Sequence, residues 1–195
     1  GLKRLHPRQV TASTFLESGW NRFEQNYLPL YVADDDASTA WVEGAPGPGV
    51  GQSLTWRGPR LKKAKAFKLF IRNGYQKTKE LYAANARPRA IEVTPLAAQE
   101  GGPTQDGTPV KVELADQLGW QLIDLPVPPS ATGFRLTVQS VYPGKVYEDM
   151  AVSDLQVYVD AEDTYVPEIE QQAAEQIRTF AADRAKAAKE GKFSA

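Results

Sequence analysis

The sequence predicts an all-β domain, an antiparallel sandwich or barrel, followed by one C-terminal α-helix. Three observations indicate this class. Short segments in which apolar and polar residues alternate recur up to about residue 160. Segments rich in Gly and Pro separate them. From Pro167 onward the chain changes to an alanine-rich, charged pattern with helical periodicity.

Seven segments carry a strand pattern. The clearest is Ala66–Arg72, in which Phe67, Leu69 and Ile71 share one face. Many short strands separated by turn-forming segments are typical of an antiparallel sandwich or barrel. Within this domain, the segment Gln76–Ala86 predicts either one helical turn or a loop. The other six strand candidates are Gln52–Trp56, Arg89–Thr94, Val110–Leu114, Trp120–Ile123, Phe134–Tyr142 and Asp154–Val159, and the predicted loops are Glu43–Gly51, Gln99–Pro109 and Pro126–Gly133.

The stretch "PEIEQQAAEQIRTFAADRAKAAKEGK" predicts an amphipathic helix. Pro167 suits the first helical position, acidic residues occupy the first turn, basic residues occupy the last turns, and Gly191 follows as a stop signal. The apolar stripe on one face of this helix contains few large side chains. Its members are Ile169, Ala173, Ile177 and Phe180.

We therefore expect two units, a β-sandwich domain over residues 1–162 and a helix or linker over residues 163–195. The helix pattern leaves three roles open. The helix either docks weakly on the sandwich, mediates self-association, or leads into a neighbouring domain. The chain begins "GLKRLHPRQ" without methionine, which indicates a piece excised from a longer protein. It carries neither an apolar run near the ~20 residues of a membrane span nor a signal-peptide pattern.

The basic residues are unevenly distributed. Eleven of the 23 Lys and Arg residues lie between Thr55 and Ala90, where Glu80 is the only acidic residue, although the net charge of the chain is -1. Such a segment forms either a patch for nucleic acid, anionic glycan or lipid headgroups, or solvated strand faces that acids from elsewhere balance. We favour the second interpretation and expect no nucleic acid partner.

Several kinds of catalytic chemistry find no support in the sequence. The absence of cysteine excludes disulfides, thiolate metal sites and a cysteine nucleophile. The only histidine, His6, lies near the start of the chain, where a general base is hard to hold rigidly. The stretch "GAPGPGVG" lacks the Lys-Ser/Thr pair of a phosphate-binding loop. We therefore predict that the chain is not an enzyme.

The acidic stretch "ADDDASTAW" has two interpretations. Asp34, Asp36 and Ser38 are spaced like the start of an EF-hand loop, but Thr39 stands where that loop needs Gly and Ala45 where it needs Glu. A short turn of this kind still offers carboxylates, a hydroxyl and carbonyls to a hard cation, closed by one acid from a distant strand. The alternative is a surface turn whose aspartates cap backbone amides.

The motifs of the chain resemble those of a known family. "ADDDASTAWVEG" is similar to the "N-A-x-D-G-D-x-x-T-A-W" segment of discoidin-like, galactose-binding-like domains, and "VSDLQVY" to their closing "I-S-E-I-x-V-Y" strand. "GPGVGQSL", "FIRNGYQK", "YAANARPRAIEV" and "VYPGKVYEDMAVSD" resemble, in order, the bacterial NADase-type glycan-binding branch, over roughly residues 9–160. The resemblance implies an eight-stranded antiparallel jelly-roll β-sandwich, followed here by the C-terminal α-helix.

The resemblance also implies a structural Ca²⁺ site. Asp34, Asp36 and Thr39 match the first motif, and Asp154 matches the glutamate of the last strand. Asp35 replaces the usual glycine of the turn, and Asp154 is one methylene shorter than glutamate.

Ligand-binding candidates lie in the loops. Aromatic faces with a few fixed polar groups suit carbohydrate, but for Trp41 the strand position favours burial over sugar stacking. Asn73 also suits a turn with Gly74, and Arg87 also suits pinning a loop. The candidates are Trp20, Asn21, Arg22, Tyr27, Asn73, Tyr75, Asn85 and Arg87.

The sequence thus predicts a non-catalytic binding module that recognises carbohydrate or another surface ligand as part of a larger bacterial protein. Its expected location is extracytoplasmic, in the periplasm or at the cell surface. The alternative is a structural protein–protein interaction domain of a multiprotein assembly, in which the C-terminal helix supports self-association.

Overall fold

The structure, a computed structural model, describes residues 1–17, 27–61, 64–126, 130–161 and 166–190. Within these ranges it contains eleven β-strands, a 3-10 helix η1 (Pro29–Ala33) and two α-helices, α1 (Lys79–Ala84) and α2 (Pro167–Glu190). The strands are β1 (Lys3–Leu5), β2 (Gln9–Ala12), β3 (Trp41–Val42), β4 (Ser53–Arg57), β5 (Ala64–Asn73), β6 (Arg87–Ala97), β7 (Gln105–Asp106), β8 (Val110–Glu113), β9 (Trp120–Asp124), β10 (Ala131–Tyr142) and β11 (Ala151–Ala161).

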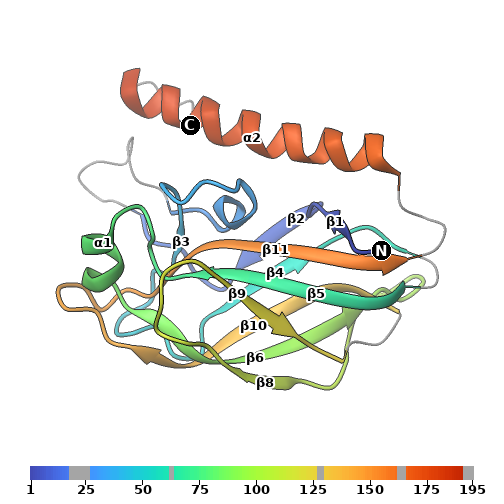
Figure 1. Cartoon of the computed structure of the whole chain (residues 1–195), viewed down its shortest axis with the longest axis horizontal. Helices are drawn as coiled ribbons and strands as arrows, with labels where there is room; N and C mark the ends of the chain where they lie inside the picture. Colours follow the sequence, from blue (N-terminus) through green and yellow to red (C-terminus); the bar gives the residue numbers. More distant parts are fainter. Residues whose placement is uncertain (18–26, 62–63, 127–129, 162–165, 191–195) are drawn as a thin grey trace.

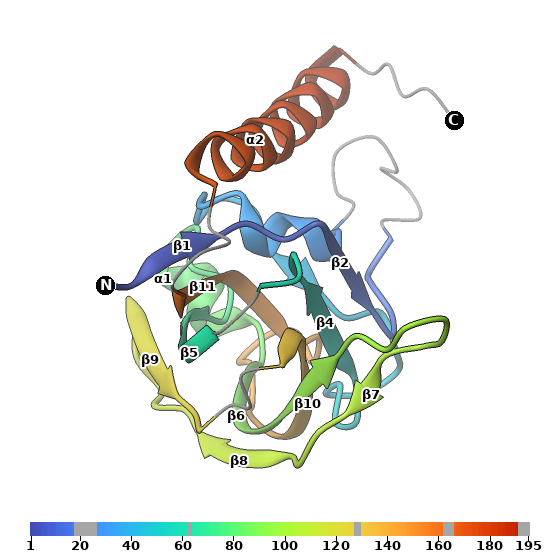
Figure 2. The same cartoon turned by 90° about the vertical axis from the view of Figure 1, so that its right-hand side faces the viewer.

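The strands form two antiparallel sheets that pack face to face (Figures 1 and 2). One sheet has the order β1-β11-β5-β9, with β3 paired to β11. The other has the order β2-β4-β10-β6-β7, with β8 paired to β6. Consecutive strands often belong to different sheets, so the chain crosses repeatedly between the two layers. The predicted all-β antiparallel sandwich with a C-terminal helix is confirmed.

All seven predicted strands are present, because their alternation extends over enough residues to be visible in the sequence. The prediction missed β1, β2, β3 and β7, which are two to four residues long and leave no periodic signal. Of the two readings of Gln76–Ala86, the helical one holds. The side chain of Thr78 caps α1 by accepting a hydrogen bond from the backbone N–H of Leu81.

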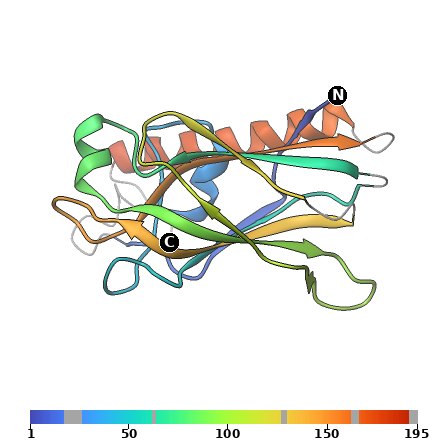
Figure 3. The same ribbon diagram turned by 60° about the horizontal axis from the view of Figure 1, so that its bottom comes forward.

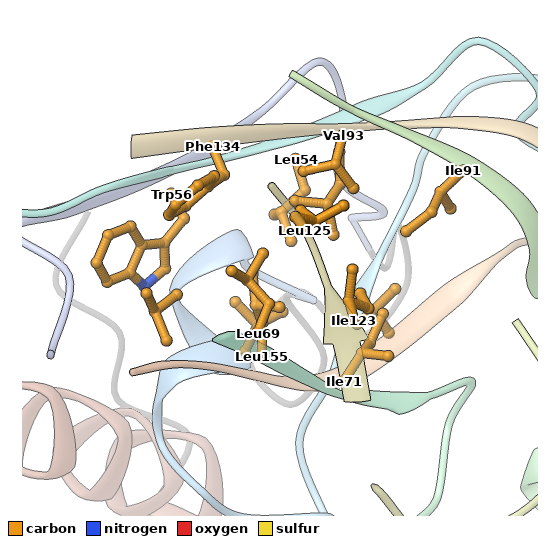
Figure 4. Close-up of a cluster of buried hydrophobic side chains, with 14 of the residues drawn as sticks. Leu54, Trp56, Leu69, Ile71, Ile91, Val93, Ile123, Leu125, Phe134 and Leu155 are labelled. Carbon is orange, nitrogen blue, oxygen red and sulfur yellow. The ribbon is translucent and has the colours of Figure 1, made fainter. Parts of the chain in front are cut away.

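The hydrophobic core lies between the two sheets (Figure 4). Successive strand residues point to opposite faces, so every second residue of the long strands enters this layer. The rings of Phe67 and Phe134 meet edge to face across it, with centroids 5.3 Å apart. Trp41 is buried as predicted, and its Nε1 donates to the carbonyl of Thr14 at 2.9 Å. Other core residues are Leu54, Trp56, Leu69, Ile71, Ile91, Val93, Ile123, Leu125 and Leu155.

One end of the sandwich gathers several connections. Figures 1 and 3 both place α1 beside the loop between β10 and β11 at this end. Backbone hydrogen bonds hold the two together, from Lys145 N–H to Ala83, from Tyr147 N–H to Ala84, and from Ala86 N–H to Asp149. We call this part of the molecule the loop end.

Helix α2 packs along one side of the sandwich, over η1 and the β1–β2 connection (Figures 1 and 2). Glu170, in its first turn, is 4% exposed and accepts hydrogen bonds from the backbone N–H of His6 at 2.6 Å and from Arg8 Nη2 at 2.8 Å. Farther along, Arg184 Nε donates to the hydroxyl of Tyr31 at 3.1 Å. The only histidine therefore lies in a helix-docking contact.

The predicted apolar stripe of α2 is only partly used for packing. Ala173 and Ile177 are buried, whereas Ile169 and Phe180 are 49% and 37% exposed. No helix within the described residues has the length and apolar character to span a membrane.

The docking of α2 depends on Glu170, and the variant Glu170→Ala tests this. The change removes a buried acceptor of two hydrogen bonds, one from a charged donor, so we expect urea unfolding to show a loss of about 1–3 kcal/mol. The exposed neighbour Glu168 is the matched control, and Glu168→Ala should change stability by less than about 0.5 kcal/mol. Equal effects of the two variants would contradict the assigned contact.

The same contact has a pH dependence. Burial raises the pKa of Glu170, but the hydrogen bonds from His6 and Arg8 outweigh burial, so the net pKa lies below its ordinary value of 4.5. A depressed carboxyl pKa stabilises the folded state above the ordinary value, and this contribution disappears as the pH falls through the folded pKa. The stability difference between the native protein and Glu170→Gln should therefore shrink below pH 4.5.

Candidate functional site

The acidic turn Asp34–Thr39 follows η1 and lies over the outer face of β11. Asp34 is buried and accepts hydrogen bonds from the backbone N–H of Asp36 at 2.9 Å and from the hydroxyl of Thr39. The exposed carboxylate of Asp36 instead accepts from the N–H and hydroxyl of Ser38, at 2.9 and 2.7 Å. Capping of the turn, one of the two predicted interpretations, is therefore present.

Asp35 occupies the position where the related motif has glycine. Its φ is +61°, in the left-handed region that glycine tolerates best and Asp better than most other residues. Its carboxylate forms a two-pronged ion pair with Arg4, at 2.5 and 2.6 Å, and accepts from Gln156 Nε2 at 3.1 Å. These contacts hold the strained residue against β1 and β11.

Asp154 lies at the centre of the same region and is fully buried. Its Oδ2 accepts from Arg72 Nε at 2.8 Å and from Arg72 Nη2 at 2.6 Å, whereas its Oδ1 has no hydrogen-bond partner among the described residues. Burial raises the pKa of Asp154 to about 8 against the opposing charge of Arg72, and the nearby Asp34 and Asp35 raise it further. Burial likewise raises the pKa of Asp34 to about 6.

The predicted metal ligands therefore separate into two groups. Thr39 donates to Asp34, whose charge acts on the nearby Asp154. Asp36 offers its carbonyl, which accepts from the Thr39 hydroxyl at 3.0 Å, whereas its carboxylate accepts from Ser38. In the part of the chain that the structure describes, no three His, Cys, Asp or Glu side chains form a metal-binding group. The unpartnered Oδ1 of Asp154 fits a cation, and Arg72 already brings one positive charge to the other oxygen.

The polar residues predicted to bind ligand make structural contacts. Asn73 is fully buried, with its Nδ2 donating to the carbonyl of Pro88 at 2.8 Å, and Asn85 ends α1 by donating to the carbonyl of Leu81 at 2.9 Å. Their binding role stays a prediction, and these contacts occupy groups that a ligand would need. The predicted positions Trp20, Asn21 and Arg22 lie outside the described residues.

Arg87 is also predicted to bind ligand and is 7% exposed. Its guanidinium pairs with Asp116 at 2.8 and 3.0 Å and donates to the carbonyls of Tyr82 and Asn85, at 2.9 Å each. It also lies over the ring of Tyr82, 4.7 Å from the centroid. These contacts are those expected of a residue that pins a loop, the alternative considered from the sequence.

Two predicted aromatic residues keep some accessible surface at the loop end. The rings of Tyr27 and Tyr75 meet edge to face with centroids 6.1 Å apart, and the Tyr75 hydroxyl donates to the carbonyl of Ser38 at 3.1 Å. Burial raises the pKa of Tyr27, with smaller contributions from Tyr147 and Asp149. Tyr147 and Asp149, in the β10–β11 loop, are therefore within electrostatic range of Tyr27.

Tyr147 was not among the residues predicted from the sequence. It is 51% exposed at the loop end, and the adjacent Val146 is 69% exposed. An apolar pair beside Gly144, between two strand patterns, was the available signal, but exposure is not readable from the sequence. Asp149, two residues on, has a raised pKa because of burial and the charge of Glu148. The loop end thus brings together three tyrosines and a carboxylate.

The arginines of the basic segment are largely paired with distant acids. Arg72 pairs with Asp154, Arg87 with Asp116, and Arg89 with Glu113. This arrangement agrees with the predicted balance of charge in space.

The antiparallel sandwich has the fold of galactose-binding-type and F5/8 type C domains of known structure. The family of NAD glycohydrolase translocation F5/8 type C domains matches residues 5–158, and the chain belongs to this family. The resemblance seen in the motifs is thereby confirmed.

Solved structures share the fold at low sequence identity. A family 32 carbohydrate-binding module of NanJ from C. perfringens, in complex with galactose, has 16% identity and a TM-score of 0.52, covering 81% of this chain and 99% of its own. A second Clostridium perfringens module, in complex with GalNAc-β-1,3-galactose, has 16% identity and a TM-score of 0.53, covering 80% and 99%. An F5/8 type C domain from Bacteroides fragilis has 11% identity and a TM-score of 0.53, covering 79% and 92%. No curated protein sequence matches the chain.

The pair of Arg72 and Asp154 predicts a large mutational effect. Arg72→Met removes the guanidinium that holds Asp154 Oδ2, and the carboxyl then stays buried in its protonated form without that partner, so we expect the free energy of unfolding to fall by about 1–3 kcal/mol in a urea titration. Arg89→Met is the control, because the side chains of Arg89 and Glu113 are 54% and 69% exposed and such pairs contribute about 0–1 kcal/mol.

A double variant separates lost charge from lost packing. Combining Arg72→Met with Asp154→Leu removes both charges, and apolar replacement of a buried pair is often neutral. The double variant should therefore recover most of the stability lost in Arg72→Met. A double variant as unstable as the single one would show that the ion pair is not the source of the effect.

Proposed function

We propose that this domain binds carbohydrate at its loop end, as the recognition module of a larger, extracytoplasmic bacterial protein. The observation that carries the proposal is the cluster of Tyr27, Tyr75, Tyr147 and Asp149 at the end of a sandwich of this family. The galactose and GalNAc-β-1,3-galactose complexes of domains with this fold support the ligand class.

The chemistry of the cluster suits a sugar. A pyranose presents C–H groups on one face and hydroxyls at its rim, so it stacks on an aromatic ring and bonds to nearby polar atoms. Tyr147 offers the most accessible ring of the three tyrosines, and Asp149 offers acceptor oxygens beside it. Asn73, Asn85 and Arg87 support this surface by fixing the backbone beneath it.

The variant Tyr147→Ala tests the proposal. Loss of a stacking ring should weaken binding about tenfold or more, measured by glycan array and then by calorimetry with the best neutral or acidic glycan found. Tyr147→Phe keeps the ring and is the matched control, so it should bind within a few-fold of the native protein. Full binding by Tyr147→Ala would place the glycan elsewhere.

Arg87→Ala is a poor test of ligand contact. Because Arg87 is buried among Asp116, Tyr82 and Asn85, its removal should destabilise the loop end, and any loss of binding would follow from unfolding.

We also propose that Asp34, Thr39 and Asp154 hold a structural Ca²⁺. The unpartnered Oδ1 of Asp154 and the clustering of two buried carboxylates support it, since Ca²⁺ prefers oxygen ligands. The ion would fix the acidic turn against β11.

Thermal melts with roughly 5–10 mM Ca²⁺ and with a chelator test whether the site binds Ca²⁺. A ligand that binds only the folded state must raise the melting temperature. We expect a rise of roughly several degrees with Ca²⁺. Asp154→Asn should abolish the rise, while Asp36→Asn should keep most of it. Equal melting temperatures with Ca²⁺ and chelator would refute the site.

A further inference from the structure

The outer face of the five-stranded sheet carries a groove separate from the loop cluster. Its volume is about 410 Å³, and it is lined by Leu2, Phe70, Trp120, Gln156 and Tyr158. Four of these residues come from β5, β9 and β11, and Leu2 directly precedes β1. Phe70 faces Gln156 on β11, so the lining follows the strand register.

The composition of this face is unusual for a solvent-facing sheet surface, which normally carries polar residues. Trp120 and Leu122 on β9 are 37% and 47% exposed, and Leu2 is 45% exposed. Helix α2 packs over η1 and the β1–β2 connection, whereas β9 lies at the opposite edge of the sheet from β1 (Figure 2). The apolar surface therefore stays accessible.

Neighbouring contacts fix the lining side chains. The guanidinium of Arg72 lies 4.7 Å from the centre of the Trp120 ring, and the rings of Phe70 and Tyr158 meet edge to face at 5.4 Å. Gln156 Nε2 donates to Asp35, and its Oε1 accepts from the Tyr158 hydroxyl at 3.3 Å. Each end of this amide keeps capacity for one more hydrogen bond. The groove is thus a preformed surface of rings with one polar group among them.

Charged residues of both signs border the groove. No charged residue lines it, and the two nearest arginines are paired, Arg4 with Asp35 and Arg72 with Asp154. Lys68, on the same face, stands opposite Asp124 in the strand register. A ligand that carries net charge would gain no counter-charge here, which favours an uncharged ligand.

From this geometry we infer a second carbohydrate site, a platform for a neutral saccharide on the sheet face. The volume falls within the ~300–1,000 Å³ of small-molecule sites, and apolar rings with few fixed polar groups are the usual lining of such sites. A neutral pyranose matches both features, with its C–H face on Trp120 or Phe70 and its hydroxyls on Gln156. The inference extends the proposed carbohydrate-binding function to a different surface.

The test is titration of the full chain with lactose, N-acetyllactosamine and cellotetraose by calorimetry and by tryptophan fluorescence. Trp120→Ala should weaken binding about tenfold or more, and Trp120→Phe should retain part of it. Leu122→Ala is the matched control, because Leu122 lies on the same strand and face but does not line the groove. It should bind like the native protein, and thermal melts should show all three variants folded.

Comparison with Tyr147→Ala separates this inference from the loop-end proposal. The sheet-face site is supported if Trp120→Ala binds the saccharide more weakly than the native protein while Tyr147→Ala retains binding. Weakening in Tyr147→Ala alone overturns the sheet-face site and leaves the loop end as the site. No binding of any of the three saccharides by the native protein overturns the sheet-face site, whereas the loop-end proposal is then decided by the glycan array. A dimer that Trp120→Ala dissociates, seen by sedimentation without saccharide binding, would assign the groove to self-association and overturn the inference.

Discussion

The pairing of Arg72 with the buried Asp154 connects three parts of the molecule. The two residues face each other on β5 and β11, at the centre of the five-stranded sheet. Arg72 also donates to the carbonyl of Asp35 at 3.3 Å, which joins the acidic turn to the sheet, and it covers the ring of Trp120. Burial disfavours an ionised carboxyl at this position, and the charge and hydrogen bonds of Arg72 oppose that effect. One guanidinium thus contacts the buried acid, the acidic turn and the Trp120 ring together.

A second constraint acts at the loop end, where several backbone groups lie away from water. Buried carbonyls and N–H groups need partners, and side chains supply them where no strand does. Glu43, fully buried, accepts from the N–H of Ala45 at 2.8 Å and of Met150 at 3.3 Å, and so ties two loops together. Asn73 and Arg87 act in the same way. These hydrogen bonds tie the loops of this end together, and the ring of Tyr147 remains exposed there.

Much of the fold could be predicted from the sequence, and less of the site. The long strands and α2 follow from periodicity alone, and the link between the acidic turn and Asp154 follows from the motif resemblance. The pairing of Asp154 with Arg72 could not be predicted from the sequence, because only the β5–β11 register places the two residues side by side. Asn73 and Arg87 were predicted as ligand contacts because residue type does not distinguish a polar group that binds sugar from one that satisfies a buried carbonyl.

The raised pKa values of Asp34 and Asp154 illustrate why such shifts need a geometric context. A carboxyl with a strongly raised pKa inside a cleft indicates an acid–base catalyst. Here both carboxyls lie beneath the acidic turn, one bonded to Thr39 and the other to Arg72, and neither lines the sheet-face groove. A ligand in that groove would contact aromatic rings and the Gln156 amide, and neither of these two carboxyl groups. Burial thus accounts for the raised pKa of both acids, and their hydrogen bonds lie within the acidic turn and between β5 and β11.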